Sequence, residues 1–168
     1  MITLSNALSI VRIPLALLFF WQNIYIRIIA IVLAMFTDSI DGYFARKYKS
    51  ASKFGAYLDP AMDKFFVYFV LAILLLENQI LLWQALAMIS RDFALIIFGL
   101  YLGITKKWAS YEVKAVRWGK VTTAMQFCVL IGVTLKFSFS WYIYSLFIVL
   151  GVLAFIELIV SSFSKRAT

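Results

Sequence analysis

Residues 37–64 read TDSIDGYFARKYKSASKFGAYLDPAMDK and decide how the chain is organised. Half of the chain's 8 acidic residues lie here, as Asp38, Asp41, Asp59 and Asp63. Long apolar segments flank the stretch on both sides, and a short basic segment divides it. The pattern predicts two apolar helices that are joined at one end, with carboxylates on both helices close to the connection.

The composition is that of a membrane protein. The chain has 168 residues, of which 64% are hydrophobic, and its mean hydropathy is +0.95. Soluble domains are about half apolar, so this chain has too little polar surface to cover a water-facing shell. The 18% aromatic content suits the aromatic belts at membrane interfaces. The length predicts one domain over residues 1–168.

Six apolar segments are long enough to cross a bilayer, which takes about 20 residues as a helix. We therefore expect an all-α integral membrane bundle of six transmembrane helices. The expected spans are 8–25, 27–46, 58–76, 79–103, 120–138 and 141–163.

The basic residues predict the orientation of this bundle, because cytoplasmic loops are enriched in lysine and arginine. Of the 16 basic residues, eleven fall at 46–53, 106–120 and 165–166, on one predicted side. The opposite side carries only Arg27 and Lys136. Both termini are therefore expected in the cytoplasm. Topology also explains the net charge of +8, so no nucleic-acid partner is expected.

The four aspartates need a compensating partner, because a charge inside the membrane costs about 2.5–3.5 kcal/mol on insertion scales. Asp38 and Asp41 are spaced i, i+3, and Asp59 and Asp63 are spaced i, i+4, so each pair shares one helix face. Facing pairs without a cation would repel and raise each other's pKa. One or two divalent cations would give a hard, all-oxygen site for Mg²⁺ or Mn²⁺.

Small residues and an arginine accompany the carboxylates. Gly42, Ala45 and Gly55 would open a slot beside the metal ions for a ligand that approaches closely. Arg46 lies one turn beyond Gly42, where its planar guanidinium could meet a phosphate.

Two other interpretations of this cluster exist. Small residues and Arg–Asp pairs also occur where membrane helices pack together, as in a non-catalytic transporter or assembly subunit. A proton or ion path would spread its acids across the membrane, whereas these four gather at one end. The chain has no histidine, which excludes histidine-based acid–base chemistry and metal ligation.

The run Asp38-x2-Asp41-Gly42-x2-Ala45-Arg46-x8-Gly55-x3-Asp59-x3-Asp63 resembles the signature of the CDP-alcohol phosphatidyltransferases, with every fixed position filled. Two further stretches are similar to members of this family. They are LSNALSIVRIP near the N-terminus and GKVTTAMQ at the start of the expected fifth helix.

The resemblance implies a membrane enzyme with its active site at the cytoplasmic end of the second and third helices. Such enzymes transfer a phosphatidyl group from CDP-diacylglycerol to an alcohol and release CMP, and they often form homodimers. Asp38, Asp41, Asp59 and Asp63 would bind a pair of Mg²⁺ or Mn²⁺ ions, and Asp63 would also be the catalytic base. The implied CDP-diacylglycerol contacts are Gly42, Arg46 and Ser52, together with Ser5, Asn6 and Ser9.

The acceptor alcohol is the most open part of this interpretation. A phosphorylated acceptor requires basic residues near the metals, and Arg91, Arg117 and Lys120 are the candidates, although Arg91 could instead pair with Asp92 or Glu157. The overall pattern resembles bacterial inner-membrane members that use glycerol 3-phosphate. The Arg91-Asp92 pair also resembles members that form cardiolipin with phosphatidylglycerol as acceptor. Inositol phosphate and serine are further possible acceptors.

Overall fold

The computed structural model describes residues 4–48, 53–104 and 117–164, and it describes side-chain surroundings for 9–37, 61–98, 104 and 121–160. Over these residues the chain is helical and has no strand. The elements are α1 (Leu4–Leu17), η1 (Leu18–Phe20), α2 (Ile24–Tyr48), α3 (Lys53–Leu76), α4 (Leu82–Met88), α5 (Ser90–Ile104), α6 (Arg117–Thr134) and α7 (Trp141–Ser164). They form two compact units, each described by itself below.

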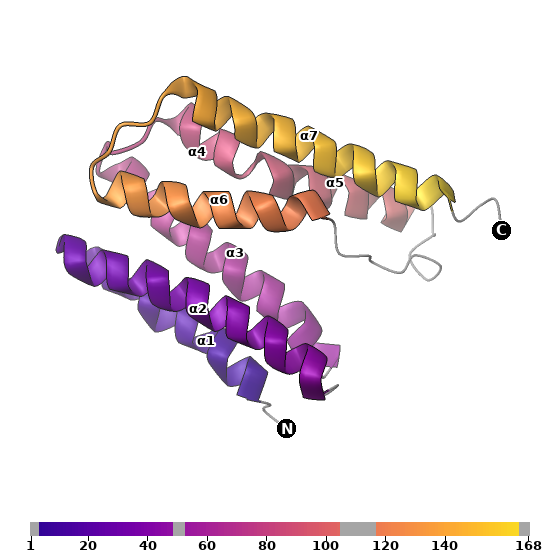
Figure 1. Ribbon diagram of the computed structural model, residues 1–168, viewed down its shortest axis with the longest axis horizontal. Coiled ribbons are helices and arrows are strands. Elements are labelled where there is room, and N and C mark those ends of the chain that lie inside the picture. Colours follow the sequence, from indigo (N-terminus) through magenta and orange to yellow (C-terminus); the bar gives the residue numbers. More distant parts are fainter. Residues whose placement is uncertain (1–3, 49–52, 105–116, 165–168) are drawn as a thin grey trace. The chain divides into compact units, whose positions relative to one another are not determined.

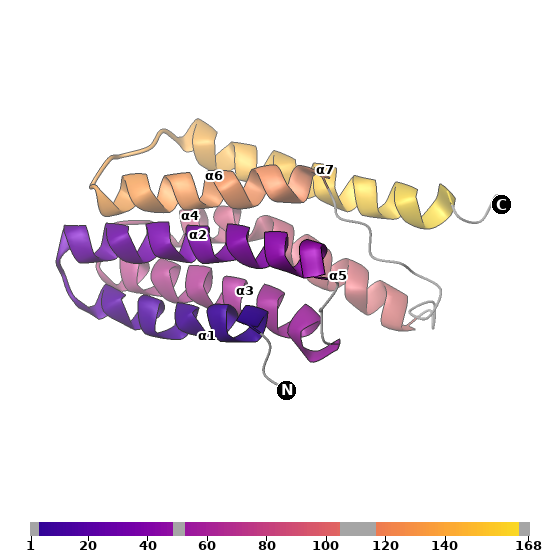
Figure 2. The same cartoon turned by 60° about the horizontal axis from the view of Figure 1, so that its bottom comes forward.

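The first unit comprises α1, η1, α2, α3 and the end of α6 from Leu130 onward. In this unit α1 packs against both α2 and α3 (Figures 1 and 2). Ala30 and Ala34, one turn apart on α2, are completely buried, and such small residues let membrane helices approach closely. The rings of Phe19 and Phe66 meet edge to face with centroids 6.4 Å apart.

Local signals in the sequence set the ends of these helices. The Asn23 side chain accepts hydrogen bonds from the backbone N–H of Tyr25 at 2.9 Å and of Ile26 at 3.4 Å, which caps the start of α2. At the end of α3, Asn78 adopts a left-handed φ of 56°, and its N–H donates to the carbonyl of Leu75 at 3.0 Å. Asparagine tolerates this conformation better than most residues, so the helix ends there.

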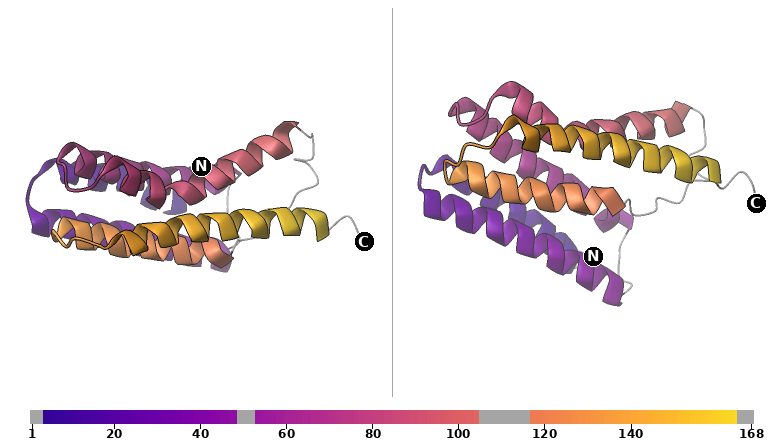
Figure 3. Two further views of the ribbon diagram at one scale, coloured as in Figure 1. Left: turned by 90° about the horizontal axis from the view of Figure 1, so that it is seen from above. Right: turned by 45° about the horizontal axis from the view of Figure 1, so that its top comes forward.

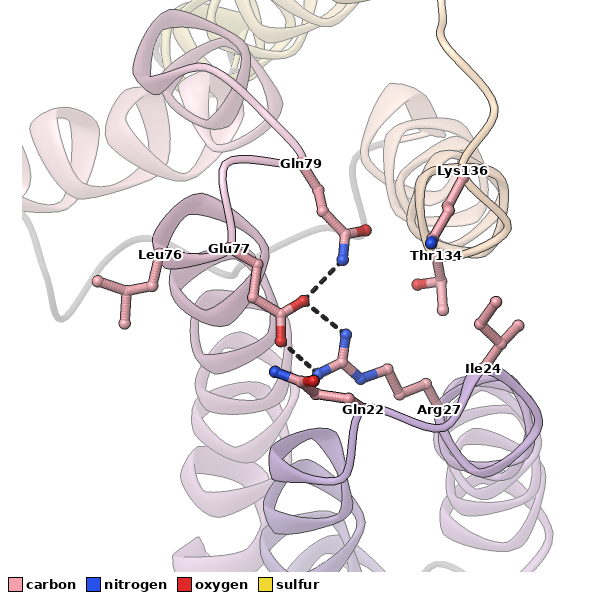
Figure 4. A pocket seen from close by; sticks show the side chains of 8 residues that line it. All are labelled: Gln22, Ile24, Arg27, Leu76, Glu77, Gln79, Thr134 and Lys136. Atoms are coloured by element: carbon pink, nitrogen blue, oxygen red, sulfur yellow. Dashed lines mark hydrogen bonds and ion pairs between the residues drawn. The ribbon is translucent and has the colours of Figure 1, made fainter.

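A buried arginine connects the N-terminal end of α2 to the C-terminal end of α3. Arg27 is only 4% exposed, and its Nη1 and Nη2 donate to the two carboxylate oxygens of Glu77 at 2.7 and 2.6 Å (Figure 4). Arg27 also donates to the backbone carbonyls of Trp21 at 2.9 Å and Phe19 at 2.6 Å. Because these bonds favour the ionised carboxylate, the Arg27 guanidinium lowers the pKa of Glu77 below its ordinary value.

The second unit comprises α4, α5, α7 and α6 as far as Val129, and in it α7 packs against α4 and α5 (Figure 3). The prediction of one continuous helix over 79–103 is wrong, because the chain leaves helical geometry at Ile89, with ψ of 4°. Asp92 donates its backbone N–H to Ile89 at 2.9 Å, which frees the carbonyl of Met88. The Gln126 amide donates to that carbonyl at 3.2 Å, so the break is stabilised by tertiary contacts.

Four of the other predicted segments each lie mainly on one α-helix, whereas 8–25 also includes η1 and the turn before α2, which begins at Ile24. Within the part of the chain that the structure describes, one helical segment, Trp141–Val160, is long and apolar enough to cross a membrane. Three shorter apolar helical segments accompany it, at Ser9–Phe20, Ile24–Thr37 and Val121–Thr134.

Candidate active site

Helix α2 ends and helix α3 begins at the same end of the first unit, and the four aspartates lie near that end. Asp38 and Asp41 are in the C-terminal part of α2, and Asp59 and Asp63 are in the N-terminal part of α3. Both stretches are helical without interruption, so each pair occupies one helix face, as the spacing predicts. The side chains of the first three aspartates lie outside the described residues.

The Asp63 side chain is described, and its carboxylate forms an ion pair with Nη1 of Arg12 on α1. The Arg12 side chain is 1% exposed and the Asp63 side chain is 31% exposed. The arginine therefore approaches the carboxylate from the packed interior of the first unit, while part of the Asp63 side chain stays accessible. A buried guanidinium that donates to a carboxylate limits the rotamers that the carboxylate can adopt.

Arg12 is the residue at this site to which the sequence analysis assigned no role. The available signal was an arginine in the middle of an apolar helix, which marks a functional position by default. Its partner, however, is 51 positions away in the sequence and is revealed only by the packing of α1 on α3. Ser9 lies one turn before Arg12 and is completely buried, so both residues belong to the packed face of α1.

The predicted nucleotide contacts are distributed over the same three helices. Ser5 and Asn6 are in α1, Gly42, Ala45 and Arg46 are in α2, and Gly55 is in α3. Their backbone positions agree with a site at this end of the unit, and their side chains lie outside the described residues. Ser52 falls in the undescribed connection between α2 and α3.

The predicted acceptor residues lie on helices of the second unit. Arg91, in the first turn of α5, is partly buried and donates from Nη1 to the hydroxyl of Thr123 on α6 at 2.8 Å. Arg117 and Lys120 are in the first turn of α6, with side chains outside the described residues. The structure therefore brings Arg91 to α6, the helix that also carries the two other candidates.

The donor set of the four aspartates fits divalent metal ions. It is composed only of carboxylate oxygens, the ligands that Mg²⁺ and Mn²⁺ prefer. Two aspartates lie on each of α2 and α3, at i, i+3 spacing on α2 and i, i+4 spacing on α3. Asp38, Asp41, Asp59 and Asp63 are thus the residues that could hold such ions.

Comparisons with known proteins identify relatives of this chain. A CDP-diacylglycerol–glycerol-3-phosphate 3-phosphatidyltransferase of Haemophilus influenzae is 32% identical over 136 residues, covering 77% of this chain and 72% of the relative. The protein of the same name from Yersinia enterocolitica is 36% identical over 118 residues, covering 68% of this chain and 62% of the relative. In the one from Bacillus subtilis, 66 residues are 41% identical, covering 39% of this chain and 34% of the relative.

The sequence profile of the CDP-alcohol phosphatidyltransferases matches residues 1–160, almost the whole chain. That match includes α1, the four aspartates of α2 and α3, and the Arg91–Thr123 pair. The family expected from the sequence is therefore confirmed. The chain is an enzyme of the CDP-alcohol phosphatidyltransferase family.

Proposed function

We propose that this enzyme transfers the phosphatidyl group of CDP-diacylglycerol to glycerol 3-phosphate. A hydroxyl oxygen of glycerol 3-phosphate forms a new bond to the phosphatidyl phosphorus, the bond from that phosphorus to the CMP oxygen breaks, and the hydroxyl proton goes to a carboxylate. The products are phosphatidylglycerol phosphate and CMP. The observation that carries the proposal is the complete set of family aspartates on adjoining helix ends, with Asp63 held by Arg12.

The proposed setting is a bacterial inner membrane crossed six times, with α4 and α5 together forming the fourth crossing. Both termini and the aspartate end of the first unit would face the cytoplasm. Helix α7 supports this setting because it is apolar on both its buried and its exposed face, which is typical of a membrane span. Its exposed face carries Leu146, Val149, Val152, Ile156 and Val160.

The four aspartates would hold one or two Mg²⁺ or Mn²⁺ ions, consistent with their carboxylate chemistry. Such ions, when bound, would neutralise the charge that develops on the departing CMP and orient the phosphate for in-line displacement. The chain's own carboxylates then determine where the nucleotide diphosphate can lie.

Asp63 is the proposed base because its accessible carboxylate could receive the proton of the acceptor hydroxyl. Arg12 donates to this carboxylate from the buried side, so it would fix the direction in which the Asp63 carboxylate faces. Arg12 thereby acts as a positioning residue for the base.

The remaining proposed roles are those that the sequence and the family resemblance suggest. Gly42, Ala45 and Gly55 would leave room for the cytidine diphosphate, and Arg46 would bind its phosphates. Further proposed contacts to CDP-diacylglycerol come from Ser52, Asn6 and Ser9. The phosphate of glycerol 3-phosphate would be bound by Arg91, Arg117 and Lys120.

Phosphatidylglycerol is the second candidate acceptor, which would make the enzyme a CMP-forming cardiolipin synthase. The observation that favours it is the Arg91-Asp92 sequence at the start of α5. Because the names of the relatives specify glycerol 3-phosphate, we place this acceptor second.

The test is metal-dependent CMP release by the purified protein in mixed micelles with CDP-diacylglycerol. Each acceptor is supplied alone: glycerol 3-phosphate, phosphatidylglycerol, inositol phosphate or serine. We expect release with glycerol 3-phosphate and a loss of at least about a hundredfold in the Asp63→Asn variant, the range for a missing general base. Release only with phosphatidylglycerol would replace the first acceptor by the second.

A further inference from the structure

A cavity of about 500 Å³ lies at the end of the first unit opposite the aspartates. Its volume is within the 300–1,000 Å³ that is typical of small-molecule sites. It is lined by Gln22, Ile24, Arg27, Leu76, Glu77, Gln79, Thr134 and Lys136 (Figure 4). Arg27 and Lys136 are the two basic residues that the sequence assigns to the non-cytoplasmic side, and both line this one cavity.

Among the residues that the structure describes, one positive charge at the cavity has no carboxylate partner. The guanidinium of Arg27 is neutralised by its paired bonds to Glu77 at 2.7 and 2.6 Å. Lys136 has no carboxylate within ion-pair distance among the residues that the structure describes. Figure 4 shows its ammonium group on the opposite wall from Glu77 and Gln79. A monoanion would balance this charge.

The hydrogen-bonding groups specify more than charge. Arg27 uses four of its five N–H groups on Glu77, Trp21 and Phe19, and within the described residues no acceptor meets the fifth. The Gln79 amide nitrogen donates to Glu77 at 2.6 Å, whereas its Oε1 is buried without a hydrogen-bond donor in the described residues. A buried acceptor of this kind is costly unless a donor reaches it. A ligand with an anionic oxygen and a hydroxyl group would satisfy the fifth N–H of Arg27 and the Oε1 atom of Gln79.

The backbone at Lys136 also points to a role for its side chain. Lys136 has a φ of 63°, in the left-handed region where glycine or asparagine is favoured at a helix end. Its N–H donates to the carbonyl of Val133 at 2.8 Å, which ends α6. Ending the helix needs only this backbone geometry, so the lysine side chain is not required for it.

The position of the cavity suggests the source of the ligand, and this step rests on the proposed membrane orientation. The turn between η1 and α2 lies at the non-cytoplasmic interface in that orientation. Trp21 and Tyr25, which flank Gln22, are 60% and 78% exposed. Exposed Trp and Tyr are typical of the lipid headgroup level.

We propose that this cavity binds the headgroup of an anionic, hydroxyl-bearing glycerophospholipid in the leaflet opposite the active site. The phosphodiester lies between Lys136 and the free N–H of Arg27, and a headgroup hydroxyl donates to Gln79. The site is a binding site, and no bond is made or broken there.

The test uses the full chain in detergent and native mass spectrometry with dioleoyl-phosphatidylglycerol. Lys136→Asn removes the charge and keeps a residue that tolerates the left-handed backbone, and Lys136→Arg is the matched control that retains the charge. We expect Lys136→Asn to weaken binding about fivefold, the value of one basic residue near anionic lipid, and Lys136→Arg to bind within about twofold of the wild type. Equal binding by all three proteins would overturn the proposal.

Three further arms identify the ligand chemistry. Phosphatidylcholine, which is zwitterionic, should bind more weakly than phosphatidylglycerol, and equal binding would contradict the assigned charge. Phosphatidic acid lacks the headgroup hydroxyls, so the wild type should prefer phosphatidylglycerol and Gln79→Leu should lose that preference. Displacement of the lipid by millimolar glycerol 3-phosphate in the wild type but not in Lys136→Asn would show a site for a free phosphate and refute the lipid.

CMP release separates this inference from the proposed function. Lys136→Asn and Lys136→Arg should release CMP at the wild-type rate, because the cavity and the aspartates are at opposite ends of α2 and α3. A wild-type protein that releases no CMP would refute the proposed reaction and leave the lipid result to be judged by the binding arms. Equal loss of CMP release and of lipid binding in Lys136→Asn would place both effects in one site and overturn the separate cavity.

Discussion

Replacing Arg27 by methionine should destabilise the protein by about 3 kcal/mol, at the lower end of the 3–5 kcal/mol for removing one partner of a buried ion pair. The side chain is 4% exposed and makes four hydrogen bonds of 2.6–2.9 Å. The substitution leaves the carbonyls of Phe19 and Trp21 without this donor. The lower end applies because Glu77, with 23% of its side chain exposed, can regain water.

The pair itself can be isolated with Glu77→Gln. This variant keeps an acceptor for Arg27 and both backbone bonds, so its cost should be about 1.5 kcal/mol, the range for a hydrogen bond to a charged group. The double variant should cost no more than Arg27→Met alone, because the partner of Glu77 is already missing. The resulting coupling energy would be about 1.5 kcal/mol, within the range for residues in one network.

The assay is reversible unfolding in mixed micelles of increasing denaturing detergent, with CMP release as a check that each variant is folded at the start. A loss below about 1 kcal/mol for Arg27→Met, the value of an exposed pair, would show that the network is only a surface contact. Strict additivity of the two substitutions would refute the coupling between Arg27 and Glu77.

The pH dependence of the same variants provides an independent measurement. Arg27 lowers the pKa of Glu77 from its ordinary value of 4.5, so the carboxylate stabilises the folded state fully above about that pH. This stabilisation is lost as the pH falls through the lower pKa of the folded state. The stability difference between the wild type and Glu77→Gln should therefore be constant near neutrality and shrink only below about pH 4.5.

Three further substitutions test the candidate active site and the packing of the second unit. Arg12→Met should lower kcat about a hundredfold because Asp63 is misplaced, which is the scale for loss of alignment near a reacting group. KM should change less, and Arg12→Lys should partly restore kcat. An unchanged kcat would contradict the positioning role. Gly151→Ala places a Cβ 3.0 Å from the Ser90 hydroxyl oxygen and 3.1 Å from a backbone nitrogen of α5. Thermal unfolding should therefore show a stability loss of about 1–3 kcal/mol from overpacking. A stability gain would show that α5 can shift to make room for the methyl group. Gln126→Leu leaves the Met88 carbonyl unpaired and should cost about 1–3 kcal/mol in the same measurement, whereas a neutral result would mean that water replaces the amide.

The hydropathy of the sequence was sufficient to predict the helices but not their interruption. Asn23 and Asn78 mark helix ends through local signals, a side-chain cap and a residue that accepts a left-handed φ, although the expected first span, 8–25, runs past Asn23. The break at Ile89 has a weaker local signal, Ser90 and Asp92, residue types that favour turns and helix starts, which the hydropathy of the segment does not register. It depends on Gln126, a residue 38 positions away that supplies the missing donor to Met88.

The same distinction separates the parts of the candidate site. The aspartates were predicted because two carboxylates at i, i+3 or i, i+4 must share a face of any helix. Arg12 was not assigned to the site, because its partner is determined by how α1 packs on α3 and not by spacing along either helix. Residue type gave a warning, since a fully buried arginine in an apolar helix needs a counter-charge, but it could not name Asp63.

Arg27 shows that a rule based on counting basic residues does not describe the local structure around each one. The orientation was predicted by counting Arg27 as one of only two basic residues on the non-cytoplasmic side. Such a count treats Arg27 as a loop residue. The structure instead buries it against Glu77, with four of its N–H groups bonded to Glu77, Trp21 and Phe19. A buried charge on the side where basic residues are rare therefore needs a reason beyond topology. The carboxylate of Glu77 accounts for the charge of Arg27, which leaves Lys136 as the cation that an anionic headgroup would balance.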